Sequence, residues 1–251
     1  MQNKTWQDLT RQGMEAFRQN QYQDALILLQ HAERKAPGVR EVRYWLANAL
    51  RMTGNSERAQ NLFRQLLAEN PADTDAAFGL GYLLLSLGRT EDAADVLHAT
   101  ARQEGIGTEG LLQIAGFLRN CNRFDAAIEL CRQARDLEPE RADLHFKLAR
   151  LYQGTGDFER ARKLYKDALK VSPDSPTVRF NLAEIDFCTK DWQRCHDAFT
   201  QLLDDLKAPD QTAMRRLVEF KIMLCKLKLY QVDQARKMVD NHGFLEDSPY
   251  H

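Results

Sequence analysis

The sequence predicts an all-α protein, an α-solenoid of about six to seven helical hairpins, because three kinds of residue recur regularly. Glycine or asparagine usually stands five residues before a recurring small residue, and proline often stands twelve residues after it. The small residues themselves return every 34 residues, at Ala25, Ala59, Ala93, Ala127, Ala161 and Cys195. A fixed period of this length is typical of stacked helical hairpins.

Each repeat is expected to contain a helix, a tight turn, a second helix and a stop. Small residues between the two helices allow their axes to approach to roughly 8–10 Å. Glycine and asparagine accept the left-handed backbone conformation that ends a helix, and proline, which lacks an N–H donor, stops the second helix. Six tandem units within residues 1–209 are predicted to span 6–39, 40–73, 74–107, 108–141, 142–175 and 176–209.

The residues that should pack the hairpins together are mostly apolar. In the second to sixth units the seventh position is Leu or Ile, whereas the first unit has Gln12 there, which we interpret as a polar cap on the outer side. The sixth unit has Asp186 at an apolar position, so its first helix is expected to be slightly rotated. Since one hairpin cannot bury its own apolar face, neighbouring hairpins must stack into one elongated array.

The period breaks after the sixth unit. Ala235 lies 40 residues after Cys195, so about six residues are inserted, and residues 207–211 have the composition of a longer connection. Residues 210–240 are predicted to form a degenerate seventh hairpin, or C-terminal capping helices, with one helix from Thr212 to about Tyr230 and another from residue 232 to 240. Met223 then falls at a position that is small elsewhere. Residues 241–251 have no helical pattern and are expected to be a tail.

Composition excludes several classes of protein. The mean hydropathy is −0.54, and no run approaches the roughly 20 apolar residues that cross a bilayer, so no membrane association is expected. The first residues lack the apolar core of a secretory signal. Five cysteines without paired spacing indicate reduced thiols and a cytoplasmic location.

Charge argues against a nucleic-acid binder. The net charge is −1, whereas such proteins normally carry a basic footprint. One local excess exists, because residues 212–240 contain seven basic and three acidic side chains. This segment is either a patch for an acidic partner or a solvated outer face of the last hairpin.

No catalytic motif is present in the sequence. It has no Gly-rich phosphate loop, no Gly-x-Ser-x-Gly elbow and no His-Glu-x-x-His motif. Cys195 and His196 are adjacent, but neighbours on a helix point about 100° apart, and we interpret Cys195 as a substitute for a packing alanine. We therefore predict no enzyme activity, no catalytic residues, no metal and no cofactor.

The pattern resembles the tetratricopeptide repeat (TPR). That repeat has small residues at positions 8, 20 and 27, large apolar residues at 7, 11 and 24, and proline at 32, and the resemblance covers residues 6 to about 209. It implies a right-handed α-solenoid in which the first helix of each hairpin lines a concave groove. Proteins of this kind hold peptides or segments of other proteins in that groove.

The resemblance also implies a set of groove residues at positions 5, 9 and 12 of the units. Aromatic residues and arginine, which are enriched at binding hot spots, predominate among them, and an asparagine could hold a peptide backbone through its amide. The aromatic residues at position 5 could instead pack against the neighbouring hairpin. The candidate groove residues are Tyr44, Asn48, Arg51, Phe78, Tyr82, Leu85, Leu112, Arg119, Phe146, Arg150 and Phe180.

One specialised function of the family does not fit. Some members clamp the C-terminal carboxylate of heat-shock chaperones, using lysine at position 2 of one unit. This chain has acidic residues at that position, such as Asp75 and Glu109, which would repel a carboxylate. A chaperone carboxylate clamp is therefore not expected.

The sequence favours a non-catalytic scaffold or adaptor that binds a protein or peptide partner. The alternative is the substrate-selecting portion of a larger multidomain enzyme, such as a transferase. RNA recognition by related helical repeats is a third hypothesis, against which the strict period and the near-neutral charge argue. Self-association through an uncapped end is a fourth.

Overall fold

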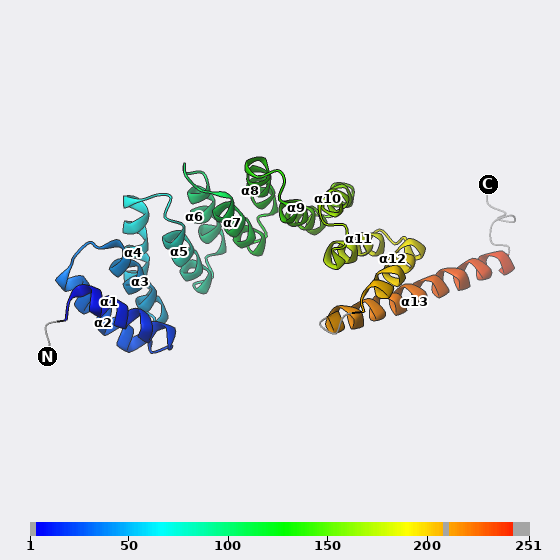
Figure 1. The fold of residues 1–251 in the computed structure, drawn as a ribbon. Coiled ribbons are helices and arrows are strands. Elements are labelled where there is room, and N and C mark those ends of the chain that lie inside the picture. The colour runs from blue at the N-terminus through cyan, green and yellow to red at the C-terminus, as the bar shows by residue number, and fades with distance from the viewer. Residues whose placement is uncertain (1–3, 208–210, 243–251) are drawn as a thin grey trace, which may run out of the picture. The chain divides into compact units, whose positions relative to one another are not determined.

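The computed structural model describes residues 4–207 and 211–242, which form helices and no strand (Figure 1). The chain divides into two compact units, Met1–Leu137 and Glu138–His251, where the sequence suggested one continuous array. The helices of the first unit are α1 (Trp6–Arg18), α2 (Tyr22–Lys35), α3 (Arg40–Met52), α4 (Ser56–Glu69), α5 (Thr74–Ser86), α6 (Thr90–Ala101), α7 (Thr108–Asn120) and α8 (Phe124–Leu137).

The second unit contains five helices within the described residues. Four of them form two further hairpins, and the last is much longer than the others. They are α9 (Ala142–Gly154), α10 (Phe158–Val171), α11 (Pro176–Cys188), α12 (Trp192–Asp205) and α13 (Thr212–His242). Both units are thus made of consecutive helical hairpins, and the fold is an all-α solenoid.

The turn inside each hairpin has the left-handed residue that the sequence predicts. The backbone φ angle is positive at Gly54, Gly88 and Gly156, where glycine adopts it without steric cost. It is also positive at the two asparagines of this position, Asn20 and Asn122. The sixth hairpin turns on a lysine with a φ of 63°, a conformation that a side chain with a Cβ adopts only at a cost of roughly 1–2 kcal/mol.

The small residues of the period lie where the paired helices touch. Ala25, Ala59, Ala93, Ala127, Ala161 and Cys195 are all fully buried. Gly13 also allows a close approach, because a Cβ there would lie 2.7 Å from Cγ of Leu29. The large apolar residues of the second helices fill the remaining space, and Leu29 and Phe63 are also fully buried.

The polar residue in the core of the sixth hairpin has a charged partner. Asp186 is buried on α11, and the Arg162 guanidinium of α10 donates to its Oδ1 at 2.6 Å. A second guanidinium, that of Arg194 on α12, lies 3.6 Å from Oδ2. A buried carboxylate requires such partners, so an ion pair accommodates Asp186 at the apolar position.

The predicted seventh hairpin is wrong, because α13 is one continuous helix of 31 residues. The predicted turn would place Tyr230 where the other hairpins have glycine, asparagine or Lys190 with a positive φ. The sequence around Tyr230 has no glycine, asparagine or proline, so nothing there ends the helix. The predicted tail lies outside the described residues from 243 onward, and residues 241 and 242 belong to α13.

One face of α13 completes the core of the second unit. Val218 and Cys225 are fully buried against a cluster that includes Phe199 and Leu202 of α12. Two free thiols meet there, with Sγ of Cys195 2.9 Å from Sγ of Cys225, and burial raises the pKa of both. Met223, predicted at a small packing position, is instead 57% exposed.

Candidate functional site

A hollow of about 370 Å³ opens between α5 and α7, the first helices of the third and fourth hairpins. We call it the α5–α7 hollow. Four of the predicted groove residues, Phe78, Tyr82, Leu85 and Arg119, line it together with four residues that the prediction missed. The lining is Phe78, Tyr82, Leu85, Gln113, Gly116, Phe117, Arg119 and Asn120.

Aromatic rings form the apolar wall of the α5–α7 hollow. Phe78 and Tyr82 lie one turn apart on α5, with their ring centroids 6.2 Å from each other. Both contact the buried Phe117 edge to face, at centroid distances of 6.0 Å and 5.4 Å. These contacts hold the rings in place while Tyr82 remains 52% exposed, so the wall is a fixed and partly exposed aromatic surface.

The space in the α5–α7 hollow arises from a glycine. No heavy atom lies within 4 Å of the place where a Cβ of Gly116 would be. At the nearby helical glycine Gly79, a neighbouring side chain occupies the corresponding place, since a Cβ there would lie 2.3 Å from the ring of Phe63. Gly116 therefore leaves open volume at the surface of α7, which is the volume that a ligand side chain could occupy.

The polar rim of the α5–α7 hollow carries an arginine without a carboxylate partner. Nη2 of Arg119 donates to Oδ1 of Asn120 at 3.2 Å. No carboxylate forms an ion pair with Arg119 among residues 4–207 and 211–242, and the same holds there for Arg51 and Arg150. Other arginines of the chain, such as Arg40 with Asp73 at 2.6 Å, do form such pairs.

The predicted residues on α3 are largely engaged inside the protein. Tyr44 is half-buried beneath the Arg40 guanidinium, 5.2 Å from the ring centroid, and burial raises its pKa. Asn48 is only 7% exposed, and its Nδ2 donates to the carbonyl oxygen of Tyr44 at 3.0 Å. Nη2 of Arg51 lies 3.5 Å from Oδ1 of Asn48, and its Nε is buried with no hydrogen-bond partner among the described residues.

Two predicted groove residues belong to the core instead. Asn48 was expected to hold a peptide backbone, but its amide bonds within its own helix, and we remove it from the candidate site. Leu112 is also only 7% exposed. Both side chains are buried, so neither offers a free surface to a ligand.

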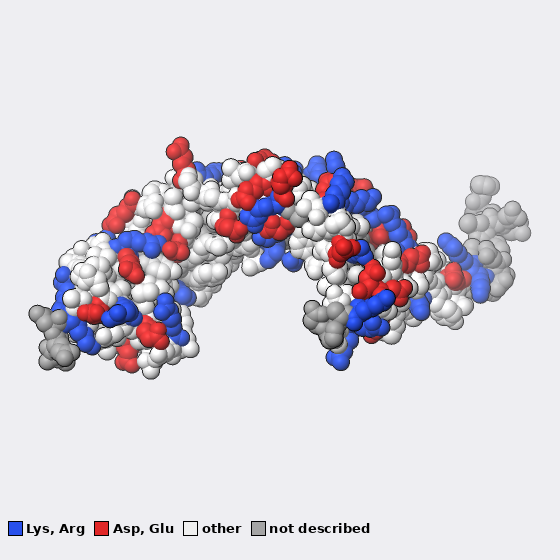
Figure 2. Space-filling view, viewed as in Figure 1, with Lys and Arg blue, Asp and Glu red and all other residues white. Residues whose placement is uncertain are grey.

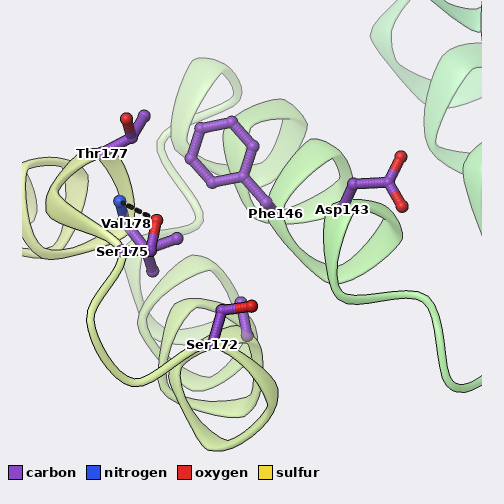
Figure 3. A pocket seen from close by; sticks show the side chains of 7 residues that line it. Asp143, Phe146, Ser172, Ser175, Thr177 and Val178 are labelled. Atoms are coloured by element: carbon purple, nitrogen blue, oxygen red, sulfur yellow. Dashed lines mark hydrogen bonds between the residues drawn. The ribbon is translucent and has the colours of Figure 1, made fainter.

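The second unit has a separate hollow of about 300 Å³ around Phe146. Figure 3 shows the Phe146 ring of α9 pointing toward Thr177 and Val178 at the start of α11. Asp143 also lines this hollow, but hydrogen bonds from Arg141 at 2.9 and 3.0 Å lower the pKa of its carboxyl group, and the guanidinium balances the charge of the carboxylate.

The remaining predicted residues of the second unit do not line the Phe146 hollow. Arg150 is exposed, with its guanidinium 6.0 Å from the Phe146 ring centroid. Phe180 packs on Phe199, with 5.3 Å between ring centroids, and so supports the core. The structure thus places the largest group of predicted residues in the α5–α7 hollow.

Side chains that could bind a metal are scattered over the described part of the chain. Within it, no group of three or more His, Cys, Asp or Glu side chains could hold a metal ion. None of its helices is long and apolar enough to cross a membrane. Figure 2 shows acidic and basic side chains interspersed over the first unit, in place of a basic stripe.

The fold and the hollow define a helical-repeat protein of the protein-interaction class. Two family models, both described as tetratricopeptide repeat, match the sequence: one over residues 53–105 and 146–194, the other over residues 16–67 and 122–166. The chain belongs to the tetratricopeptide repeat family. A comparison with curated proteins gives no match.

Solved structures share the fold at low sequence identity. YrrB, a TPR protein with an unusual peptide-binding site, is 13% identical over 75% of this chain and 97% of its own, with a TM-score of 0.51. A crystal structure of MamA is 16% identical over 70% of this chain and 94% of its own, also with a TM-score of 0.51. MamA of Desulfovibrio magneticus RS-1, from residue 41 to its end, is 20% identical over 67% of this chain and 95% of its own, with a TM-score of 0.49.

Proposed function

We propose that this chain is a non-catalytic adaptor that binds an extended protein segment in the α5–α7 hollow. The observation that carries the proposal is an open aromatic hollow with Arg119, an arginine without a carboxylate partner, on its rim. The peptide-binding site named for YrrB, which has the same fold, is consistent with a ligand of this kind.

The lining of the hollow indicates the chemistry of the segment. An apolar side chain fits beside Phe78, Tyr82 and the open surface of Gly116, and its full burial contributes about 1.5–3 kcal/mol. A carboxylate next to it in the segment would pair with Arg119, since arginine binds carboxylates in a bidentate manner. Gln113 and Asn120 can bond the backbone of the segment through their amides.

The affinity of such a contact is modest. An extended segment loses conformational entropy when it is ordered on binding. We therefore expect a dissociation constant in the micromolar range, which corresponds to a binding free energy of about −8 kcal/mol. A weak and reversible contact of this strength suits an adaptor. The five free thiols are consistent with a cytoplasmic setting, which we include in the proposal.

A selection experiment tests the proposed function. Peptides of about 12 residues, displayed as a random library, are selected on the full chain, and we expect an enriched pattern of one large apolar residue beside Asp or Glu. Gly116→Leu fills the hollow from a position with open space, and Arg119→Glu reverses the charge on its rim. Each change should weaken the best peptide by about tenfold or more.

Ala99→Leu on α6 is the matched control, because it introduces the same side chain at an exposed helical position of the first unit, away from the hollow. It should bind the selected peptide as the unaltered protein does. If Gly116→Leu and Arg119→Glu bind that peptide with unchanged affinity, the segment does not occupy the α5–α7 hollow and the proposal is wrong.

A further inference from the structure

Helix α13 carries a row of exposed apolar side chains, which we call the α13 ridge. The ridge consists of five residues that recur every three or four positions, with exposed fractions of 44–62%: Leu217, Phe220, Met223, Leu227 and Tyr230. Elsewhere in the described chain the exposed large apolar side chains, such as Ile27 and Met52, stand singly. Contiguous apolar patches of this kind mark interaction sites, whereas single exposed residues need no explanation.

The α13 ridge lies opposite the face by which α13 is fixed to its unit. Leu227 is nine residues from the buried Val218, which is about half a turn around the helix axis. The fixed side is also held by an ion pair, with Nζ of Lys221 2.8 Å from Oε1 of Glu184 on α11. The ridge is therefore exposed on a helix whose other face is fixed to the rest of its unit.

Basic side chains accompany the α13 ridge. Arg216 lies nine residues from the buried Cys225, so it points outward among the ridge residues. Lys226 and Lys228 lie on the two flanks, and Figure 2 shows basic side chains along α13 on the face that it draws. Arg216 and Lys226 have no carboxylate partner in the described residues, whereas Arg215 of the same helix pairs with Glu219 at 3.1 Å.

We propose that the α13 ridge docks an acidic amphipathic helix of a partner protein. The ridge extends over 13 residue steps, or about 20 Å of helix, which matches a partner helix of about four turns. Such a helix would lay apolar residues at positions i, i+3 or i+4 and i+7 on the ridge. Its flanking Asp and Glu side chains would face Arg216, Lys226 and Lys228, so the charges of the two surfaces are complementary.

The same charges disfavour a second copy of this chain on the ridge. A symmetric pair of ridges would bring identical patches together, with Arg216, Lys226 and Lys228 beside both ridges, and Glu219 is already paired with Arg215. A membrane surface fits less well for another reason. A helix that lies on a membrane has a wide polar face opposite its apolar face, whereas the opposite face of α13 is packed in the protein core.

Two synthetic peptides test the proposal against the full chain. One is a fluorescent helix of about 18 residues with leucine at every third or fourth position and glutamate on the flanks, and the other has lysine in place of each glutamate. We expect the acidic peptide to bind at least about tenfold more tightly by fluorescence anisotropy. Arg216→Glu combined with Lys226→Glu should invert this preference.

Surface variants locate the contact. Phe220→Ser combined with Leu227→Ser replaces two apolar side chains near the centre of the ridge. Both positions are exposed, so the thermal unfolding curve should be unchanged. Binding of the acidic peptide should fall about tenfold. Ile27→Ser, on a residue of α2 that is 48% exposed, is the matched control and should bind normally. Gly116→Leu in the α5–α7 hollow should also bind normally, which separates this test from that of the proposed function.

Three results would overturn the proposal. The first is equal binding of the acidic and basic peptides, or no binding of either at millimolar concentration. The second is a dimer in sedimentation experiments that the Phe220→Ser and Leu227→Ser changes dissolve, which would assign the ridge to a second copy. The third is flotation of the protein with phosphatidylserine vesicles through the same side chains.

Discussion

Two glycines of the first unit give a matched test of the packing. A Cβ on Gly79 would lie 2.3 Å and 2.5 Å from two ring atoms of Phe63, whereas a Cβ on Gly116 meets no heavy atom within 4 Å. Both glycines are interior to helices, so alanine should gain about 0.8–1 kcal/mol of helix propensity at either position. The two substitutions therefore differ only in the space around the new methyl group.

The overlap at Gly79 should exceed the gain in helix propensity. Phe63 is fully buried, and its ring packs against that of Tyr44 with 6.4 Å between the ring centroids, so it cannot rotate away freely. Overpacking of this kind typically costs about 1–3 kcal/mol. We expect Gly79→Ala to lower the free energy of unfolding by up to about 2 kcal/mol and Gly116→Ala to raise it by about 0.5–1 kcal/mol.

The assay is urea unfolding of the full chain, followed by far-ultraviolet circular dichroism. Both glycines lie in the first unit, so the two midpoints report on the same part of the molecule. The reasoning is refuted if Gly79→Ala raises the midpoint as Gly116→Ala does, or if both substitutions lower it equally.

Other substitutions test further features of the fold. Lys190→Gly should stabilise the protein by up to about 1 kcal/mol in urea unfolding, because the lysine has a positive φ; a lower midpoint would contradict this reason. Asp186→Ala should destabilise by about 3–5 kcal/mol, since it leaves Arg162 charged in a buried site, and adding Arg162→Met should restore most of the loss. Burial raises the pKa of Asp73, but hydrogen bonds from Arg40 and a backbone N–H outweigh it and lower the pKa overall. Its contribution is therefore complete above the unfolded pKa of about 3.9 and is lost as the pH falls through the lower folded value, so Asp73→Asn should reduce the loss of stability on acidification below about pH 4 in thermal melts.

The sequence predicts the hairpins well because their signals are local. A left-handed turn residue and a small packing residue at fixed spacing are needed in every unit, and even the Lys190 turn follows the period. The seventh hairpin is predicted from two helical patterns that follow a break in the period, without a residue near Tyr230 that ends a helix, and there the structure has a continuous α13.

The candidate site could be predicted only in part. Repeat positions bring Phe78, Tyr82 and Arg119 to one face, and the structure places them together. Asn48 occupies a corresponding position but is buried, and its amide bonds to the Tyr44 carbonyl of its own helix, which the repeat position alone does not indicate. The hollow itself depends on Gly116, where a missing side chain leaves space, and no position of the repeat pattern signals such a space.

Photocrosslinking tests the central claim most directly. A benzophenone amino acid replaces Tyr82 in the α5–α7 hollow or, as a control, Ile27 on α2, two positions of similar exposure at 52% and 48%. The account predicts that the selected peptide crosslinks at position 82 and not at position 27, and that excess unlabelled peptide abolishes the product. Equal crosslinking at both positions, or crosslinking at position 27 alone, would contradict it.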